Sequence, residues 1–375
     1  MRTLTCLSGN AARFALGLAV LAGCGTLARA DAILTAIDAA SNGLLTQQSA
    51  GGMWSGVGAT GYNGTILSGL VNAYNNTGTA SYSTAAQNGA TALINAVNAN
   101  GGSYLGDEAY ALTQAANLPG NPNSAAERTA VYNFFNATVP ANYVNANGYI
   151  NALVAHYGTD KTQATIYLSY FTLAAYAVNA PNKADFRTGL ISTLGKVADF
   201  RSDNSDYQAY PTGALGAAVW ALAQTGNGLD STPLTGPTAP AQDVFGTHTL
   251  SQLPGMLDAR LVPASHTFDW LLTDPTHTYV GYTEDTAFGI LGLSAADAAA
   301  HATTYAADVA AARLALTAAV NTATGATYDN VLSPASHYGV YAGRTLEALA
   351  VPEPVTAGLL ALGGLGLLVR RRKTK

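Results

Sequence analysis

Hydrophobic residues recur at helical spacing through most of the chain. In the stretch YNGTILSGLVNAYNNTG, one apolar stripe consists of Ile66, Leu67, Leu70, Val71 and Tyr74. This is the spacing of an amphipathic helix, and the asparagines and glycine that follow favour its end. Alternating apolar and polar residues, the pattern of a strand, do not extend over any length. The sequence therefore predicts an all-α protein.

Two kinds of helix are expected to alternate. Helices rich in Ala, Gly and Leu begin near residues 62, 106, 160, 210, 282 and 336. Each follows a loop that contains glycine or an aromatic residue: GGMW at 51, GGSY at 101, NGYI at 147, SDYQAYP at 205, THTYVGY at 276 and GATYDN at 325. More polar helices are expected near 32–48, 80–99, 123–137, 183–200, 249–262 and 297–321. A period of roughly 50 residues indicates a repeat architecture.

The alternation predicts two helical layers. Glycines allow close approach of the inner helices, at Gly69, Gly216, Gly289, Gly292 and Gly343, and the amphipathic helices form an outer ring. The "GG-x-aromatic" loop that leads into an "A-x-x-G-L-x-A-L" helix resembles the repeats of prenyltransferases and terpenoid cyclases. That resemblance implies an α/α-toroid of about six helical hairpins, which we expect as one domain over 31–351. A less regular helical array is the alternative.

Residues 226–248 interrupt the repeat. They contain three prolines and no periodicity, so they are expected to form an inserted surface loop.

The N-terminus has the pattern of a secretory signal. Its apolar core, residues 14–23, is too short to span a bilayer. Small residues at Ala28 and Ala30 predict cleavage before Asp31. The alternative is lipidation of Cys24, because LAGC resembles the lipobox of bacterial lipoproteins. Both cysteines lie in this leader, so cleavage after it leaves no thiol for a disulfide, a nucleophile or a metal site.

The C-terminus has three parts in a fixed order. They are the triplet Pro352, Glu353 and Pro354, an uncharged stretch over 355–369, and the basic run Arg370, Arg371 and Arg372. As a helix the stretch is about 22 Å long, short of the roughly 30 Å hydrocarbon core. The tail resembles the PEP-CTERM sorting signal of exopolysaccharide-producing Gram-negative bacteria. The resemblance implies a short hydrophobic sorting helix that enters the inner membrane transiently, and processing by an exosortase. An ordinary tail anchor is the alternative.

The composition of residues 31–351, the body of the protein, limits the classes of partner that it can bind. Hydrophobic residues make up 49% of the 375 residues and charged residues only 10%. Between positions 31 and 351, nine basic residues stand against 21 acidic ones, a net charge of −12. An acidic body argues against nucleic acid and anionic membrane surfaces as partners.

Carboxylates at the starts of expected inner helices are the first candidate site. Asp107 with Glu108, and Glu284 with Asp285, could serve as general acid and base in glycan hydrolysis. They could equally cap helix N-termini and complement the helix dipole. The Asp-rich motif of squalene-type cyclases and the zinc-binding cysteine of protein prenyltransferases are missing, so the fold resemblance does not carry those activities. No metal and no cofactor is expected.

A second candidate set is His337, Tyr338 and Arg344, close together in sequence. It resembles the groups with which polysaccharide lyases, some of them toroids, abstract a proton beside a uronate. A lone histidine beside a helix start is also a common structural element.

Aromatic residues in the loops are the third candidate. Trp54, Tyr104, Tyr210 and Tyr282 could gather on one face as platforms for sugar rings, or each could pack under its own loop. Together these observations predict a secreted protein of the cell envelope or extracellular matrix, with a non-catalytic body that contacts an exopolysaccharide. The alternative is a polysaccharide lyase or glycoside hydrolase with its site at the mouth of the toroid.

Overall fold

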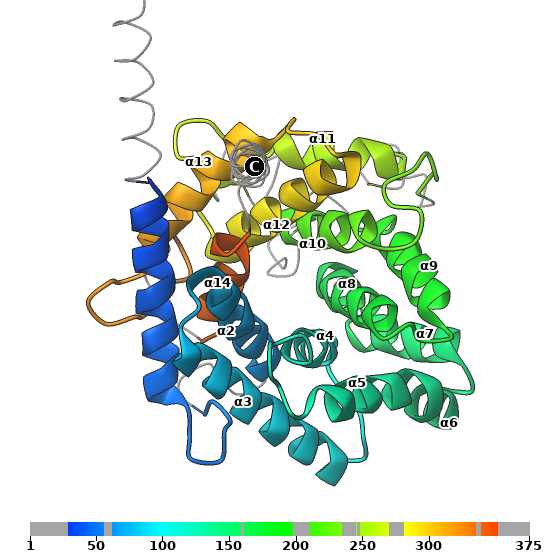
Figure 1. The fold of residues 1–375 in the computed structure, drawn as a ribbon. Coiled ribbons are helices and arrows are strands. Elements are labelled where there is room, and N and C mark those ends of the chain that lie inside the picture. Colours follow the sequence, from blue (N-terminus) through cyan, green and yellow to red (C-terminus); the bar gives the residue numbers. More distant parts are fainter. Residues whose placement is uncertain are drawn as a thin grey trace, which may run out of the picture.

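The computed structural model describes residues 29–55, 62–158, 161–197, 211–234, 245, 248–269, 281–334 and 339–351. Over these residues the chain is mostly helical, which confirms that part of the sequence prediction (Figure 1). Within them, no helix has the length and apolar character to cross a membrane. The leader up to Ala28 and the whole tail from Pro352 onward lie outside the described residues, so the predictions about both stay predictions.

Helices account for most of the described elements, and the connections between them differ in length. In chain order they are a helix over residues 29–47, α2 (Asn63–Thr77), α3 (Ala80–Ala99), α4 (Gly106–Ala115), α5 (Ser124–Asn133), the π-helix η1 (Phe134–Thr138), α6 (Val139–Tyr143), α7 (Ala146–His156), α8 (Lys161–Ala177), α9 (Lys183–Leu194), α10 (Pro211–Ala223), the 3₁₀-helix η3 (Leu250–Gln252), α11 (Leu253–Asp258), α12 (Thr283–Ala300), α13 (Ala306–Leu316), the 3₁₀-helix η4 (Thr317–Ala319) and α14 (Gly339–Leu349). Two short strands, β1 (Leu261–Val262) and β2 (Thr267–Phe268), form an antiparallel pair.

The small-residue helices contact one another in a closed cycle. Helix α2 packs on α4, α4 on α8, α8 on α10, α10 on α12, α12 on α14, and α14 returns to α2. The more polar helices lie outside this cycle: α3 contacts α2, α9 contacts α8, and both α11 and α13 contact α12 (Figure 1). The helices of the cycle are called the inner helices below.

Glycine explains how closely the inner helices approach. A Cβ on Gly343 of α14 would lie 2.4 Å from the carbonyl oxygen of Thr65 in α2, and one on Gly216 of α10 would lie 2.6 Å from the carbonyl oxygen of Phe288 in α12. Any side chain at these positions would push two helices apart, because packed interiors leave no free space for an added methyl group. The inference that small residues allow close packing is confirmed at these two positions.

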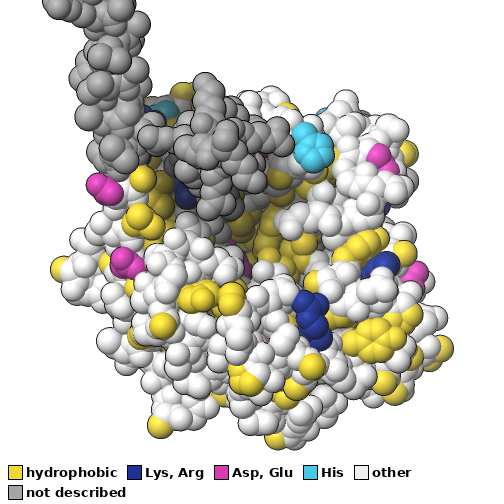
Figure 2. Space-filling model, in the orientation of Figure 1, with side chains coloured by type: hydrophobic (Ala, Val, Ile, Leu, Met, Phe, Trp, Pro, Cys, Tyr) yellow, Lys and Arg dark blue, Asp and Glu magenta, His cyan; other side chains and the backbone are white. Residues whose placement is uncertain are grey.

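Aromatic side chains connect several of the inner helices. Tyr110 of α4, Tyr170 of α8 and Trp220 of α10 contact one another, with ring centroids 5.2–5.6 Å apart. Phe288 of α12 joins them beside Tyr170, at 6.3 Å. Such tilted and edge-to-face contacts add to the burial of apolar surface. In the space-filling view, hydrophobic side chains surround the hollow in the middle of this face (Figure 2).

Helix α7 corrects one expectation. The stretch NGYI at 147 is the first turn of α7, where the sequence predicted a loop. The Asn145 side chain accepts a hydrogen bond from the backbone N–H of Gly148 at 2.8 Å, which caps the helix. Tyr149 and Ile150 are buried, so burial stabilises a helix in a segment whose asparagines and glycine resemble a turn.

The strand pair corrects a second expectation, since a polar helix was predicted over 249–262. Only η3 and α11 form there, and the chain then turns into β1 and β2. Phe268 of β2 is fully buried against Gly289 of α12, where an added Cβ would lie 2.5 Å from the Phe268 ring. Gly289 therefore makes room for the strand pair. Strands of two residues are too short to leave an alternating pattern in the sequence.

Candidate functional site

Arg344, on α14, lies at the centre of a buried polar cluster. Its Nε is 2.9 Å from Oε1 of Glu284 on α12, although the direction is not that of a hydrogen bond, so the contact is an ion pair. Its Nη1 donates to the hydroxyl of Tyr170 at 2.6 Å. The guanidinium also lies over the rings of Phe288, at 4.4 Å, and Tyr170, at 5.2 Å. Aromatic faces favour a cation in these positions.

The cluster continues from Tyr170 to two residues that the sequence analysis missed. The Tyr170 hydroxyl donates to Oε2 of Glu347 at 2.9 Å, and Ser68 of α2 donates to Oε1 of the same carboxylate. Glu347 follows Arg344 by three residues, so both lie on one face of α14. This spacing could have predicted from the sequence that Glu347 lies beside Arg344. Nothing local pointed to Tyr170 or Ser68.

Asp107, on α4, belongs to the same cluster. It is almost completely buried, and burial raises the pKa of its carboxyl to about 6, although Arg344 and the backbone N–H groups of Asp107, Glu108 and Thr65 lower it. Its Oδ1 has no hydrogen-bond partner in the described part of the chain. Asp107, Glu284 and Glu347 thus share one guanidinium. We call Arg344 and its neighbours Glu284, Tyr170, Glu347 and Asp107 the Arg344 cluster.

Glu347 and Glu108 titrate near neutrality. Burial raises the pKa of Glu347 to about 7, against the opposing effects of Arg344 and the two hydroxyl donors. Burial, and then the charge of Asp107, raises the pKa of Glu108 to about 7. Glu108 Oε2 accepts the backbone N–H of Leu105 at 2.8 Å, so this carboxylate caps the start of its own helix.

The two residues of the second predicted acid pair, Glu284 and Asp285, lie in different environments. Glu284 faces Arg344, and 29% of its side chain is exposed to solvent. Asp285 is almost completely buried, and burial, followed by the charge of Glu284, raises its pKa to about 8, while the N–H of Gly213 and the charge of Arg260 lower it. Since Gly213 lies at the start of α10, Asp285 ties α12 to its inner neighbour.

Asp107 and Asp285 occupy matching positions. The carboxylate of Asp107, at the start of α4, accepts a hydrogen bond from the backbone N–H of Thr65 at the start of α2. In the same way, the carboxylate of Asp285 on α12 accepts a hydrogen bond from the N–H of Gly213 at the start of α10. In both cases a carboxylate on one inner helix meets the free N–H groups at the start of the preceding inner helix. Such groups have no partner within their own helix, so both aspartates stabilise the packing of neighbouring inner helices.

His337, Tyr338 and Tyr210 lie outside the described residues.

The loop aromatics that are described do not form an exposed surface together. Trp54 is buried and donates from Nε1 to the carbonyl oxygen of Leu44 at 2.9 Å. Tyr104 is buried edge-on against Phe134. Tyr282 is half-buried and precedes α12. Trp54 and Tyr104 therefore present no ring face to solvent.

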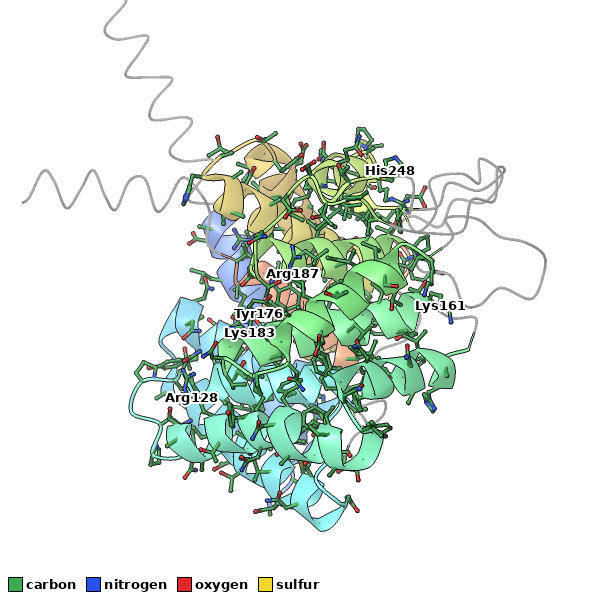
Figure 3. The ribbon with its side chains drawn as sticks, turned by 90° about the vertical axis from the view of Figure 1, so that its right-hand side faces the viewer. Arg128, Lys161, Tyr176, Lys183, Arg187 and His248 are labelled. Carbon is green, nitrogen blue, oxygen red and sulfur yellow. The ribbon has the colours of Figure 1, made fainter. Side chains whose placement is uncertain are left out.

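Basic side chains at the surface gather on one side. Between α2 and α14, the described Lys and Arg residues that reach solvent are Arg128, Lys161, Lys183, Arg187 and Lys196. The first four lie on α5, α8 and α9 and are labelled in Figure 3, and Lys196 follows α9 in the chain. Lys183 lies over the ring of Tyr176, at 5.5 Å. Arg260, Arg313 and Arg344 are buried. The expected absence of nucleic acid as a partner remains a prediction.

Within the described residues, no group of three or more histidine, cysteine, aspartate or glutamate side chains is arranged to hold a metal ion. No protein-family model matches the chain, and no curated protein matches it either.

Proposed function

We propose that the inner and outer helices form an α/α-toroid, and that the protein is a secreted component of the bacterial cell envelope or extracellular matrix. The closed cycle of inner-helix contacts, from α2 round to α14, supports the toroid. The leader and the three-part tail support secretion through the inner membrane, followed by processing at Pro352, Glu353 and Pro354 by an exosortase-type enzyme.

We propose further that the body is non-catalytic and contacts a glycan. One observation carries the non-catalytic role: each acid at an inner-helix start has a structural partner. Glu108 caps its own helix, Asp107 and Asp285 meet N–H groups of neighbouring helices, and Glu284 pairs with Arg344. Interactions of this kind hold a ring together, and they leave few free carboxylates for proton transfer to a substrate.

The glycan contact would fall on the surface of the toroid, where most polar side chains are uncharged. Its body is rich in Tyr, Asn, Ser and Thr and poor in charge, which suits hydroxyl-rich ligands because they bind through hydrogen bonds and aromatic faces.

A binding and turnover assay tests this function. The purified full-length protein is incubated with acidic and neutral polysaccharides; binding is followed by co-sedimentation, and turnover by the absorbance of unsaturated products and by reducing ends. We expect binding of at least one polysaccharide without product. Turnover that is lost in Glu284→Gln would contradict the non-catalytic role.

A polysaccharide lyase or glycoside hydrolase is the second candidate function. It is favoured by the carboxyls of Asp107 and Glu347, whose pKa values of about 6 and 7 fall near neutrality beside Arg344, and by the adjacent Glu108, whose pKa is about 7. Raised pKa values in a charged cluster are typical of acid–base catalysts. The partly exposed Glu284 would be the group in contact with substrate.

A further inference from the structure

A second polar site lies outside the ring, at the far end of α12. It is a cavity of about 350 Å³ enclosed by the turn after α10, by η3 and α11, and by the end of α12 with the segment before α13. Its polar lining residues are Asn227, Ser251, Asp297, Thr304 and Tyr305. The Arg344 cluster contributes none of the lining, so the two sites are separate.

Asp297 is the buried charge of this cavity. Only 3% of the residue is exposed. Its Oδ2 accepts the backbone N–H of Tyr305 at 2.9 Å, while its Oδ1 has no hydrogen-bond partner in the described part of the chain. The hydroxyl of Ser294, one turn earlier on α12, is also buried without a partner there. A buried polar atom without a partner is costly, so the unpartnered Oδ1 of Asp297, a residue that lines the cavity, indicates a missing partner.

Two further aspartates, Asp258 and Asp308, interact electrostatically with this region. Burial, and then the charges of Asp308 and Asp297, raises the pKa of Asp258. Burial, and then Asp258 and Asp297, raises the pKa of the Tyr305 hydroxyl. No cation of the described chain is among the groups that act on these two residues. Asp258, Asp297 and Asp308 therefore belong to one region of like charge, and such a region attracts a cation.

Arg187 is the basic residue next to this region, and it is already engaged. It donates to the carbonyl oxygens of Thr225, at 3.3 Å, and Gly228, at 2.7 Å, and its charge acts on Asp230. It lies on α9 (Figure 3). None of these contacts of Arg187 involves Asp258, Asp297 or Asp308.

The size and lining favour an organic cation over a metal ion. A metal such as Ca²⁺ needs six to eight oxygen ligands at 2.3–2.6 Å, and no metal-binding group occurs among the described residues. The cavity is as large as small-molecule sites, which start at about 300 Å³. The half-buried ring of Tyr305 lines it, and aromatic rings favour ammonium groups.

We propose that this cavity binds a small organic ammonium ion of the size of an amino sugar, with the carboxylate of Asp297 as the partner of the ammonium group. Asn227, Ser251 and Thr304 supply hydrogen bonds to the hydroxyls of such a ligand. The site shares no residue with the Arg344 cluster, so its loss would leave that cluster unchanged.

Calorimetric titration of the full-length protein with glucosamine at pH 6.5 and low salt tests this site. We expect binding of glucosamine, with N-acetylglucosamine, which lacks the positive charge, at least tenfold weaker. Asp297→Asn keeps an acceptor for the Tyr305 N–H and should weaken glucosamine binding at least tenfold. The matched control is Asp185→Asn, an exposed aspartate on α9, which should bind as the unaltered protein does.

A second variant distinguishes loss of the binding site from misfolding of Asp297→Asn. Ala300→Phe, at an exposed position that lines the cavity, blocks the space without touching the buried carboxylate and should also abolish binding. The site is refuted if glucosamine does not bind at millimolar concentration, if both sugars bind equally, or if Asp297→Asn and Ala300→Phe both retain binding. Binding of Ca²⁺ that depends on Asp297, without binding of glucosamine, would overturn the organic ligand.

Discussion

The hydroxyl of Tyr170 donates a hydrogen bond to Glu347 at 2.9 Å, and these two residues are 177 positions apart in the chain. Tyr170 lies on α8 and Glu347 on α14, which are opposite one another in the cycle of inner helices. The contact therefore crosses the middle of the ring. Because Arg344 donates to the same hydroxyl, one phenol holds both a buried cation and a buried carboxylate.

Tyr170→Phe should destabilise the protein by about 2–3 kcal/mol. The substitution keeps the ring but leaves a guanidinium N–H and a carboxylate oxygen buried without a partner, and hydrogen bonds to charged groups are worth about 1.5–3 kcal/mol. Urea denaturation followed by circular dichroism measures the change. Tyr132→Phe, on the exposed face of α5, is the control and should stay within about 0.5 kcal/mol. Equal stability of the two variants would mean that the contact contributes nothing.

Asp285→Asn should become more stable relative to the unaltered protein as the pH rises from 4 to 8. Burial raises the pKa of Asp285 from its ordinary value of 3.8 to about 8, so the folded state binds a proton that the unfolded state has released. Stability then falls as the pH rises through this window. Asparagine cannot ionise and removes this loss.

Urea denaturation at pH 4, 5, 6, 7 and 8 measures the pH dependence of Asp285→Asn. The exposed Asp185→Asn should run parallel to the unaltered protein. A constant difference between Asp285→Asn and the unaltered protein at every pH would show that Asp285 stays ionised in the fold.

Gly343→Ala should destabilise the ring by about 1–3 kcal/mol. The added Cβ would lie 2.4 Å from the carbonyl oxygen of Thr65, so α14 and α2 must separate, and overpacking of this kind has a cost of that size. Gly255→Ala on α11 is the matched control, because an added Cβ there meets nothing within 4 Å. It should stabilise slightly, since alanine favours a helix over glycine. Thermal unfolding distinguishes them, and a rise in melting temperature for both would contradict the close contact.

The tail should act as a removable signal. In a host that contains an exosortase, we expect the extracellular fraction to contain a shortened protein that ends near Pro352–Pro354. Mass spectrometry locates this new C-terminus. Replacing Pro352, Glu353 and Pro354 with alanine should leave the full-length chain in the inner membrane fraction. The same chain in a host without the enzyme is the control. Equal release from both hosts would indicate an ordinary anchor or an unrelated protease.

The same mass spectra determine the N-terminus. A mature chain that begins at Asp31 is expected from cleavage after Ala30. A lipid-modified Cys24 would support the lipoprotein alternative.

Local pattern was enough to predict most helices. The polar helix expected at 80–99 has the bounds of α3, and the small-residue helices start within a few residues of their expected positions. Helical periodicity depends on neighbours one turn away, which the sequence displays directly. The Asn-Gly stretch at 147 gave a wrong prediction because burial of Tyr149 and Ile150 outweighs a turn-like composition.

Only some residues of the candidate site could be predicted from the sequence. Arg344 and the acids at the helix starts stood out because charged residues are rare in this body. Tyr170 and Ser68 did not, since each is an ordinary polar residue inside a helix and its partner is set by the packing of other helices. The buried state of Asp297 was equally hidden, because it depends on α11 and the segment before α13.

By itself, the sequence determined a mostly helical chain, the alternation of small-residue and polar helices, and the charged residues available to the centre of the ring. The tertiary structure alone decided that α14 returns to α2, that Asp107 and Asp285 meet the helix starts beside them, and that Tyr170 joins Arg344 to Glu347. The physical reason is range: periodicity and capping act within a few residues, whereas burial and pairing depend on side chains that folding brings together from distant parts of the chain.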